Sequence, residues 1–315
     1  MIRFLRIFWE WIKRNHQPLS ALSAVAAMLT VVVSFVSLIK SADQFSNQLD
    51  AQKRATSVNI VSDFISTIGK SLVGDEKIHG NDRFERLVAT RTRLLVRSIE
   101  YPDLTNQLIY FLATNDLGKL FEMGAPGEPK HYISLGNINL QGSNIRDIEL
   151  SSVELFCANI KNAYFSNVKF DGGAIFHNAD LSGSNLINTR FLNAHFRWTN
   201  LMNLSIELTA KDLDVFNGAK ILFSNLKGLT IAKVKSSNKK TVDENEELAL
   251  MLSKAETLYG SQLDDDVDKF LKKEYPERYD ELFKDPNPDS SGEKYVSSNW
   301  LDRWKTERHN RCSQD

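Results

Sequence analysis

The chain has 315 residues, of which 42% are hydrophobic and 25% are charged, and its 39 Lys and Arg residues nearly balance its 40 Asp and Glu residues. This length is enough for one large domain or two ordinary domains with a buried core. The near-zero net charge argues against a protein that coats nucleic acid, and the apolar content excludes a disordered chain. The two cysteines, Cys157 and Cys312, form neither a metal-binding spacing nor a disulfide framework.

The first organised segment is an uncharged run from Pro18 to Ile39, which ends at Lys40. At about 1.5 Å per residue, a helix of this length covers roughly 33 Å and can cross the hydrocarbon layer of a bilayer. A signal peptide would have a shorter apolar stretch, and Lys40 disrupts the small-residue pattern that cleavage needs. A buried core helix seldom has so long an uncharged run. The sequence therefore predicts an uncleaved transmembrane helix over residues 18–39.

The charges on either side of this segment indicate its orientation. The basic, aromatic tail of residues 1–17 carries four Lys and Arg residues against Glu10, whereas the other flank carries Lys40, Lys53 and Arg54. The positive-inside rule then predicts a single-pass protein of the cytoplasmic (inner) membrane, with its N-terminus in the cytoplasm. The tail either lies as a helix in the headgroup layer or extends the spanning helix.

Residues 40–130 are predicted to form a helical stalk and an N-terminal cap. Apolar residues from Val58 to Leu72 are three, four or seven positions apart, as in an amphipathic helix. A second helix is expected from Asp82 to Glu100, with Leu87 and Leu94 among its apolar side, and a third from Asp103 to Phe121.

The second of these helices carries the densest basic cluster of the chain. The cluster consists of Arg83, Arg86, Arg91, Arg93 and Arg97. It would serve either as a contact for phosphate or acidic lipid or as a solvated face. The balanced charge of residues 40–132 favours a solvated face.

Internal repetition is the strongest signal in the sequence. From Leu135 every fifth residue is Leu, Ile or Phe, with one inserted residue near Gly172. The residue two places earlier is usually small or β-branched, and the residue between is often Asn or Asp. The fifteen apolar positions are Leu135, Leu140, Ile145, Leu150, Leu155, Ile160, Phe165, Phe170, Phe176, Leu181, Leu186, Phe191, Phe196, Leu201 and Ile206.

This spacing has a physical explanation. Alternation along a short strand directs the apolar residue and the small residue two places before it to the same face. The remaining residues form a turn, where Gly, Asn and Ser are common. Because so short a strand buries little surface by itself, successive coils must stack, about 4.8 Å apart. A period of five does not fit an α-helix.

The repeats resemble those of the pentapeptide-repeat family, whose pattern A-(D/N)-L-x-x is matched by residues 179–181 and 184–186. The resemblance implies a mainly β fold, a right-handed quadrilateral β-helix over residues 131–235 with four repeats per coil and α-helices on either side. Residues 207–215 are expected to form a bulge or a loop, since Lys211 occupies a core position in the repeat.

Four repeats per coil also predict aromatic columns inside the β-helix. Phe176, Phe196 and Phe216 should stack on one another, and Phe170 should stack on Phe191.

Features outside the repeats resemble membrane-anchored members of the same family. Residues 88–94 and 108–112 resemble the helical segment that precedes their coils, and residues 257–260, 275–276 and 282–283 resemble their C-terminal tail. The resemblance indicates little about activity, because most such proteins have no assigned reaction.

The remaining residues are predicted to form a helical C-terminal cap over residues 236–283 and a flexible or docking tail over residues 284–315. Thr241 and Glu244 form a capping box, and a short helix is expected over residues 267–275. The acidic run of residues 264–268 suits a helix N-terminus better than a calcium loop, which would need Gly at Lys269. Trp300 and Trp304 have helical spacing, and the tail is either disordered or a docking peptide.

No residue pattern indicates catalysis. The six histidines form no metal-binding spacing with Cys or Glu, and Gly69-Lys70-Ser71 lacks the upstream Gly of a phosphate-binding loop. His195 occupies an outward position that other repeats fill with Asn, and Cys157 lies at a turn position with nothing nearby to activate it. The sequence predicts a non-enzyme, with no catalytic, cofactor-binding or metal-binding residue and no cofactor.

The leading hypothesis is a membrane-anchored, non-catalytic interaction module or scaffold that contacts the lipid bilayer and an unidentified protein partner, and no nucleic acid. An alternative is a membrane effector of toxin or anti-phage type. Its spanning helices would form homo-oligomers through small residues three or four positions apart, which are Ser20, Ser23, Ala27, Thr30 and Ser34.

A third hypothesis comes from the family resemblance, because some soluble pentapeptide-repeat proteins resemble DNA and bind type II topoisomerases. Such a mimic needs a negative face. Residues 133–235 hold eight acidic and ten basic residues, so the sequence argues against this function.

Overall fold

The computed structural model divides into two compact units, Met1–Asn59 and Ile60–Asp315. It describes residue 10 and residues 18–74, 81–115, 117–122, 133–208, 214–233, 244–285 and 300–312. In the first unit the described residues, apart from Glu10, belong to one helix, α2 (Pro18–Gly74), which continues into the second unit. The side chains of this helix are described from Val32 onward.

Among the residues that the structure describes, no helix combines the length and the apolar character needed to cross a membrane. The predicted tail of residues 1–17 lies outside the described residues except for Glu10, and so do the side chains of residues 18–31 within the predicted span. The spanning helix, its orientation and the lipid contact therefore stay predictions. Lys211 and Thr241 also lie outside the described residues.

The second unit begins with a small helical core. The predicted amphipathic helix is confirmed in α2, where Val61, Phe64 and Ile68 are buried at steps of three and four residues. They share an apolar core with α3 (Asp82–Ser98) and α4 (Pro102–Thr114). The third helix is shorter than predicted, because α4 ends at Thr114 and a 3₁₀ turn, η1 (Gly118–Phe121), follows it.

Helix α3 buries only part of the apolar side that the sequence predicted, since Val88 is buried and Phe84 and Leu95 pack against the core. Its buried residues are Val88, Ala89, Thr92 and Val96. Leu87 and Leu94 are instead 46% and 67% exposed. The assignment of these two leucines to the apolar side was wrong. The buried stripe follows Val88, Thr92 and Val96, which are four residues apart, and the two leucines lie outside it.

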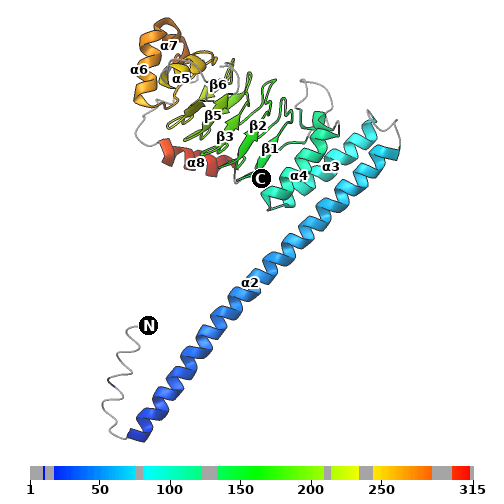
Figure 1. Cartoon of the computed structure of the whole chain (residues 1–315), viewed down its shortest axis with the longest axis vertical. Helices are drawn as coiled ribbons and strands as arrows, with labels where there is room; N and C mark the ends of the chain where they lie inside the picture. Colours follow the sequence, from blue (N-terminus) through cyan, green and yellow to red (C-terminus); the bar gives the residue numbers. More distant parts are fainter. Residues whose placement is uncertain are drawn as a thin grey trace. The chain divides into compact units, whose positions relative to one another are not determined.

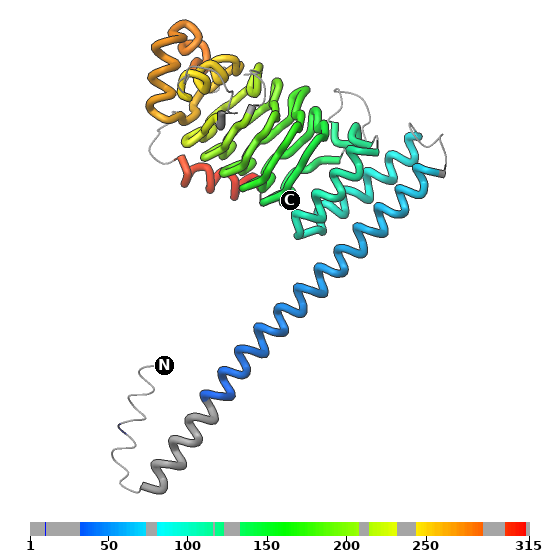
Figure 2. Tube along the Cα trace, in the orientation of Figure 1, coloured from blue at the N-terminus to red at the C-terminus, as the bar shows by residue number. Residues whose placement is uncertain are grey.

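The repeats form a parallel β-helix of about four coils with four sides, and the successive layers are visible in Figure 2. On one side β1 (Asn144–Arg146), β2 (Tyr164–Ser166), β3 (Asn185–Ile187), β5 (Ser205–Leu208) and β7 (Thr230–Lys233) pair in that order. On another side β4 (His195–Arg197) pairs with β6 (Lys220–Leu222). Partners are twenty or twenty-one residues apart as far as β5, which agrees with four five-residue repeats per coil.

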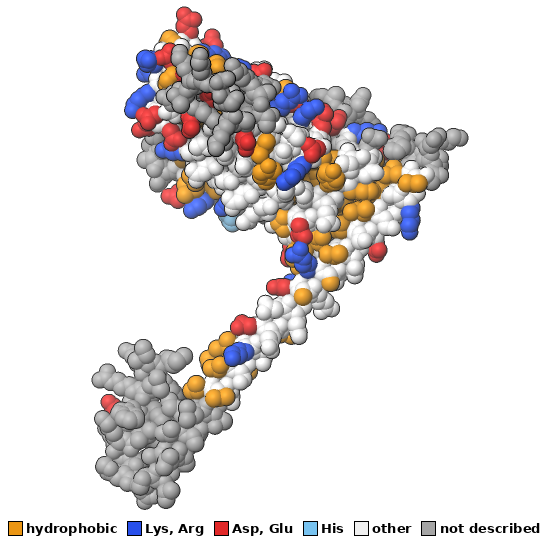
Figure 3. Space-filling model, in the orientation of Figure 1, with side chains coloured by type: hydrophobic (Ala, Val, Ile, Leu, Met, Phe, Trp, Pro, Cys, Tyr) orange, Lys and Arg blue, Asp and Glu red, His pale blue; other side chains and the backbone are white. Residues whose placement is uncertain are grey.

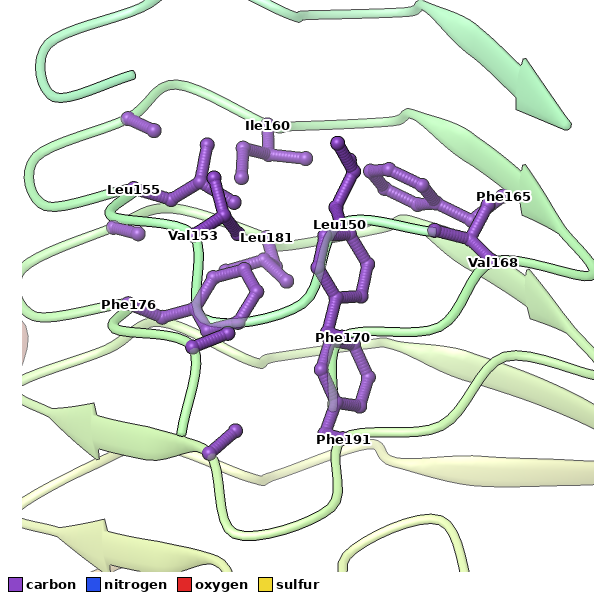
Figure 4. Close-up of a cluster of buried hydrophobic side chains, with 14 of the residues drawn as sticks. Leu150, Val153, Leu155, Ile160, Phe165, Val168, Phe170, Phe176, Leu181 and Phe191 are labelled. Atoms are coloured by element: carbon purple, nitrogen blue, oxygen red, sulfur yellow. The ribbon is translucent and has the colours of Figure 1, made fainter. Parts of the chain in front are cut away.

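The core of the β-helix confirms the five-residue rhythm. All fifteen apolar positions lie inside, and each is at most 2% exposed. The small residues two places earlier, such as Ala158 and Ala179, are buried beside them. In Figure 4, Leu150, Phe170 and Phe191 lie one above the other in successive coils.

The aromatic columns agree with prediction except at Phe216. Phe170 stacks on Phe191 with ring centroids 5.1 Å apart, and Phe176 stacks on Phe196 at 4.9 Å. Phe216 instead stacks on Phe191, with 5.7 Å between the centroids, and meets Phe196 edge to face. The prediction for Phe216 was wrong because the chain from Ile206 to Phe216 advances the coil by one side rather than two.

Helices lie at both ends of the β-helix (Figure 1). At the N-terminal end, Asn106 of α4 donates from Nδ2 to the carbonyl oxygen of Asn144, 2.8 Å away. At the other end lie α5 (Glu244–Ser253), α6 (Asp265–Glu274) and α7 (Pro276–Leu282). The amide of Leu258 donates to the carbonyl oxygen of Leu282 at 2.7 Å. These contacts satisfy backbone groups that an open last coil would leave unpaired.

The coil also continues beyond the predicted boundary at residue 235. Thr257 pairs in parallel with Lys220, and Gln262 pairs with Asn225. The buried Leu258 and Leu263 follow the apolar positions of the preceding coil. The segment after α5 therefore adds two further sides to the solenoid.

Candidate interaction surface

One corner of the β-helix is covered by helix α8 (Trp300–Cys312) (Figure 1). Four turn residues from successive coils lie at this corner, Cys157, Asn178, Trp198 and Phe223, and we call them the corner stripe. Backbone hydrogen bonds hold them in line. The amide of Cys157 donates to the carbonyl oxygen of His177, and the amide of Asn178 donates to that of Arg197. In the same way, the amide of Trp198 donates to the carbonyl oxygen of Leu222.

The corner stripe has an unusual composition for its backbone conformation. All four residues have positive φ, between 51° and 58°. Gly and Asn tolerate this conformation, whereas it destabilises other residues by roughly 1–2 kcal/mol because their Cβ approaches a carbonyl oxygen. Among the described residues, every positive-φ position outside the corner stripe holds Gly, Asn, Asp or Ser. Trp198 and Phe223 therefore need a compensating interaction.

That interaction is an aromatic cluster between the corner stripe and α8. Trp198, Phe223, Trp300 and Trp304 form a group separate from the main core, and none is more than 9% exposed. The rings of Trp198 and Phe223 stack with centroids 5.1 Å apart, and those of Trp300 and Trp304 stack at 5.7 Å. Burying an aromatic side chain of about 150–250 Å² stabilises by several kcal/mol, which outweighs the strain at the two turns.

Polar contacts fix the register of α8 on the corner. Trp300 donates from Nε1 to the carbonyl oxygen of Phe223 at 2.8 Å, and Arg308 donates from Nη2 to the carbonyl oxygen of Cys157 at 3.2 Å. The guanidinium of Arg303 lies 5.0 Å from the centre of the Trp198 ring, in a cation–π contact. The helix thus runs across the coils from Phe223 to Cys157.

A disulfide between Cys157 and Cys312 joins the last turn of α8 to the coil. The prediction that the two cysteines form no disulfide was wrong. The two cysteines are 155 residues apart in the sequence. Their spacing alone does not indicate that a helix brings Cys312 back to this corner. Cys157 is 4% exposed, whereas Cys312 is only half-buried.

The polar pairing of this interface is incomplete. Trp304 Nε1, Arg308 Nη1, Asn178 Oδ1 and Arg197 Nε are buried and have no hydrogen-bond partner among the described residues. A buried polar group without a partner destabilises by roughly 1–3 kcal/mol. The non-covalent attachment of α8 is therefore weaker than its aromatic contacts alone would suggest.

Two histidines lie beside the corner stripe, with ring centroids 6.4 Å apart. Burial lowers the pKa of His177 to about 4, and the positive charges of His195, Arg197 and Arg311 act in the same direction. Burial and then Lys220 also lower the pKa of His195, against an opposing effect of Glu256. His195 lies on β4 as an outward, half-buried residue. The imidazole of His177 is therefore neutral at neutral pH.

The other residues that the sequence singled out lie elsewhere. On α3, Arg86 pairs with Asp82 at 2.7 Å, and both side chains are well exposed. A surface depression of about 680 Å³ is lined by Arg83, Phe84 and Leu87, among others.

The acidic run begins helix α6, as expected for acids at a helix N-terminus. Asp265, Asp266 and Asp268 lie in its first turn, and Asp264 Oδ2 accepts a hydrogen bond from the amide of Gly228 at 2.8 Å. Within the described ranges, no three His, Cys, Asp or Glu side chains gather as a metal site.

Comparison with known proteins finds a family whose repeats match those of this chain. Residues 133–172 and 173–203 match the family described as pentapeptide repeats, in eight copies. No curated protein matches the chain. A solved pentapeptide repeat protein from the thylakoid lumen of Arabidopsis thaliana is 19% identical over 44% of this chain and 74% of its own, with a TM-score of 0.17. Full-length QnrB1, a plasmid-mediated fluoroquinolone resistance protein, is 14% identical over 44% of this chain and 66% of its own, with a TM-score of 0.20.

Proposed function

The chain carries eight pentapeptide repeats, and we propose that it is a non-catalytic interaction module or scaffold, anchored in a membrane by residues 18–39. Pentapeptide-repeat proteins are typically structural or interaction modules. The α8 contact supports a binding role most directly, because a corner of the coil already holds a helix through stacked aromatic rings and backbone acceptors. Helix-in-groove recognition between proteins uses the same kinds of contact.

The membrane anchor is supported by the uncharged run of residues 18–39, which suits a spanning helix in length. Its orientation is supported by two independent features. The basic tail favours a cytoplasmic N-terminus. The Cys157–Cys312 disulfide favours a coil on the opposite side, because disulfides persist in oxidising compartments and are rare in the cytosol.

Membrane fractionation tests the anchor. We expect the full chain to stay in the pellet after carbonate extraction and a chain without residues 18–39 to become soluble. A chain with the order of residues 18–39 scrambled is the matched control and should stay in the pellet, because it keeps length and composition. Full-length protein in the soluble fraction would contradict the proposal.

Protease protection tests the orientation. Added protease should digest the coil in right-side-out membrane vesicles and leave it intact in inverted ones. The reverse result would place the coil in the cytoplasm. Affinity capture from solubilised membranes, with and without residues 236–315, then separates partners of the coil from partners of the C-terminal segment.

No specific observation favours the alternatives. Two acidic residues of the coil are paired with basic ones, since Asp171 pairs with Arg190 at 2.8 Å and Glu149 with Lys169 at 3.8 Å. On the face in Figure 3, the described acidic and basic side chains are interspersed. A DNA mimic would need an extended negative face instead. The small residues of the effector hypothesis, from Ser20 to Thr30, have side chains outside the described residues.

A further inference from the structure

We propose that the Cys157–Cys312 disulfide is a thiol–disulfide exchange site, which a dithiol reductant opens to release helix α8 from the corner stripe. Release would expose Trp198 and Phe223 on the side of the coil. This inference goes beyond the proposed scaffold role and does not depend on the membrane anchor.

The two sulfurs differ in accessibility, and this difference sets the direction of attack. Cys157 is 4% exposed, whereas Cys312 lies half-buried at the end of α8. One thiolate of the reductant attacks Sγ of Cys312, the S–S bond breaks, and Cys157 leaves as a thiolate. In the mixed disulfide, one sulfur of the reductant is bonded to Sγ of Cys312. The second thiolate of the reductant then attacks that reductant sulfur. Cys312 is released as a thiolate, and the reductant becomes a disulfide after giving up two electrons.

One neighbour of Cys157 favours its departure as an anion, against the burial of the sulfur. Arg308 donates from Nη2 to the carbonyl oxygen of Cys157, and its Nη1 is buried without a hydrogen-bond partner among the described residues. Burial lowers the pKa of Arg308 and the charge of Asp180 opposes this, but the guanidinium stays charged. A neighbouring cation lowers the pKa of a thiol, and a thiol of lower pKa is a better leaving group.

The non-covalent contacts would hold α8 only weakly once the bond is open. Trp304 Nε1, Arg308 Nη1 and Asn178 Oδ1 are buried without hydrogen-bond partners among the described residues. Water can bond to these groups once the helix detaches, which favours the detached state of the helix.

The β-helix itself does not need α8. Its core cluster and the aromatic cluster under α8 share no buried residue. The backbone–backbone hydrogen bonds of the corner join one coil to the next, and none of them involves a backbone group of α8. Opening the disulfide should therefore free the helix without unfolding the coil.

Hydrogen exchange of the full chain tests the proposal, with dithiothreitol as the reductant. Amides of residues 304–312 should exchange at least tenfold faster after reduction, while amides of β2 and β3 stay protected. The Cys312→Ser variant should show the same fast exchange without reductant. A thiol titration on the native protein must find two free thiols after reduction.

Three results would overturn the proposal. The disulfide could resist dithiothreitol until the protein is denatured. Helix α8 could stay protected in the reduced chain and in Cys312→Ser, which would make it a permanent part of the fold. The coil could lose protection together with α8, which would make the disulfide a structural crosslink of the whole unit.

Discussion

The ring of Phe170 lies parallel to the ring of Phe191 in the next coil, with 5.1 Å between the centroids and 4° between the planes. Phe191 is also in edge-to-face contact with Phe176 and Phe196, and it stacks on Phe216. This side chain therefore joins three coils at the centre of the solenoid. Because protein interiors are close-packed, its neighbours cannot fill the space that its removal would leave.

We expect Phe191→Ala to lower the free energy of unfolding by about 3–5 kcal/mol, as large-to-small changes in a core do. Phe191→Leu keeps most of the volume and should lower it by about 1.5 kcal/mol or less. Urea unfolding followed by far-UV circular dichroism measures both. Equal stability of the two variants would show that the aromatic column is not the main support of the coil.

Trp198 allows the coil and α8 to be separated by a single substitution. Asn occupies the same turn position in many other repeats, so Trp198→Asn should relieve backbone strain while it removes the ring beneath Arg303. We expect α8 to lose at least tenfold in hydrogen-exchange protection and the coil to remain fully protected. Tyr164→Ala is the matched control, because Tyr164 is an outward aromatic residue on a different side of the coil.

A loss of coil protection in Trp198→Asn would contradict this account, since it would mean that Trp198 supports the turn rather than the helix. Unchanged protection of α8 would mean that Trp300 and Trp304 bind without the stacked ring. The circular dichroism of the variant distinguishes the two cases, because only the first loses β signal.

The coil could be predicted because its signal is local and repeated. The apolar positions from Leu135 to Ile206 are five residues apart, except for Phe170 and Phe176, which are six apart, and strand alternation converts that spacing directly into an inward column. Phe216 shows the limit of this reasoning. The geometry of the chain between Ile206 and Phe216 decides how many sides it crosses, and counting residues does not reveal this.

The contact with α8 could not be derived in the same way, because it joins Cys157 to a helix more than a hundred residues later. The sequence nevertheless contains a partial signal. From Leu135 to Leu201, the residue two places after each apolar position is Gly, Asn, Asp or Ser, except at Cys157 and Trp198. Four repeats per coil place Cys157 and Trp198 at one corner, so a covering segment could have been expected there. Its identity as α8 could not. Phe223 lies at that corner only because the chain from Ile206 to Phe216 advances by one side, which the sequence does not reveal.

The environment of His177 predicts an acid-sensitive fold. Burial, with the charges of His195, Arg197 and Arg311, lowers the pKa of His177 to about 4, whereas the unfolded chain has a His pKa of about 6.5. Above pH 6.5 both states are neutral and stability does not change. As the pH falls from 6.5 towards 4, the unfolded chain binds a proton that the folded chain excludes, so the free energy of unfolding falls.

Urea unfolding across this pH range measures the effect. His177→Gln should lose less stability between pH 6.5 and 4 than the natural chain, because its residue 177 does not titrate. The Arg311→Gln variant should raise the pKa of His177, as read from its ring signals by NMR, because one opposing charge is gone. An unchanged pKa would mean that α8 does not influence His177.

Arg308 provides the last prediction, which concerns the rate of disulfide exchange. If its guanidinium stabilises the departing Cys157 thiolate, Arg308→Gln should slow reduction by dithiothreitol about tenfold, and Arg308→Lys should restore part of the rate, because it keeps the charge. The second-order rate constant, measured by trapping free thiols at fixed pH, gives both values. Arg303→Gln is the control, because Arg303 contacts Trp198. Its loss loosens α8 without removing the cation beside Cys157, so its rate should be unchanged or higher. Faster exchange in Arg308→Gln would mean that Arg308 acts by holding α8 in place, since looser docking exposes Cys312 and outweighs any effect on the leaving sulfur.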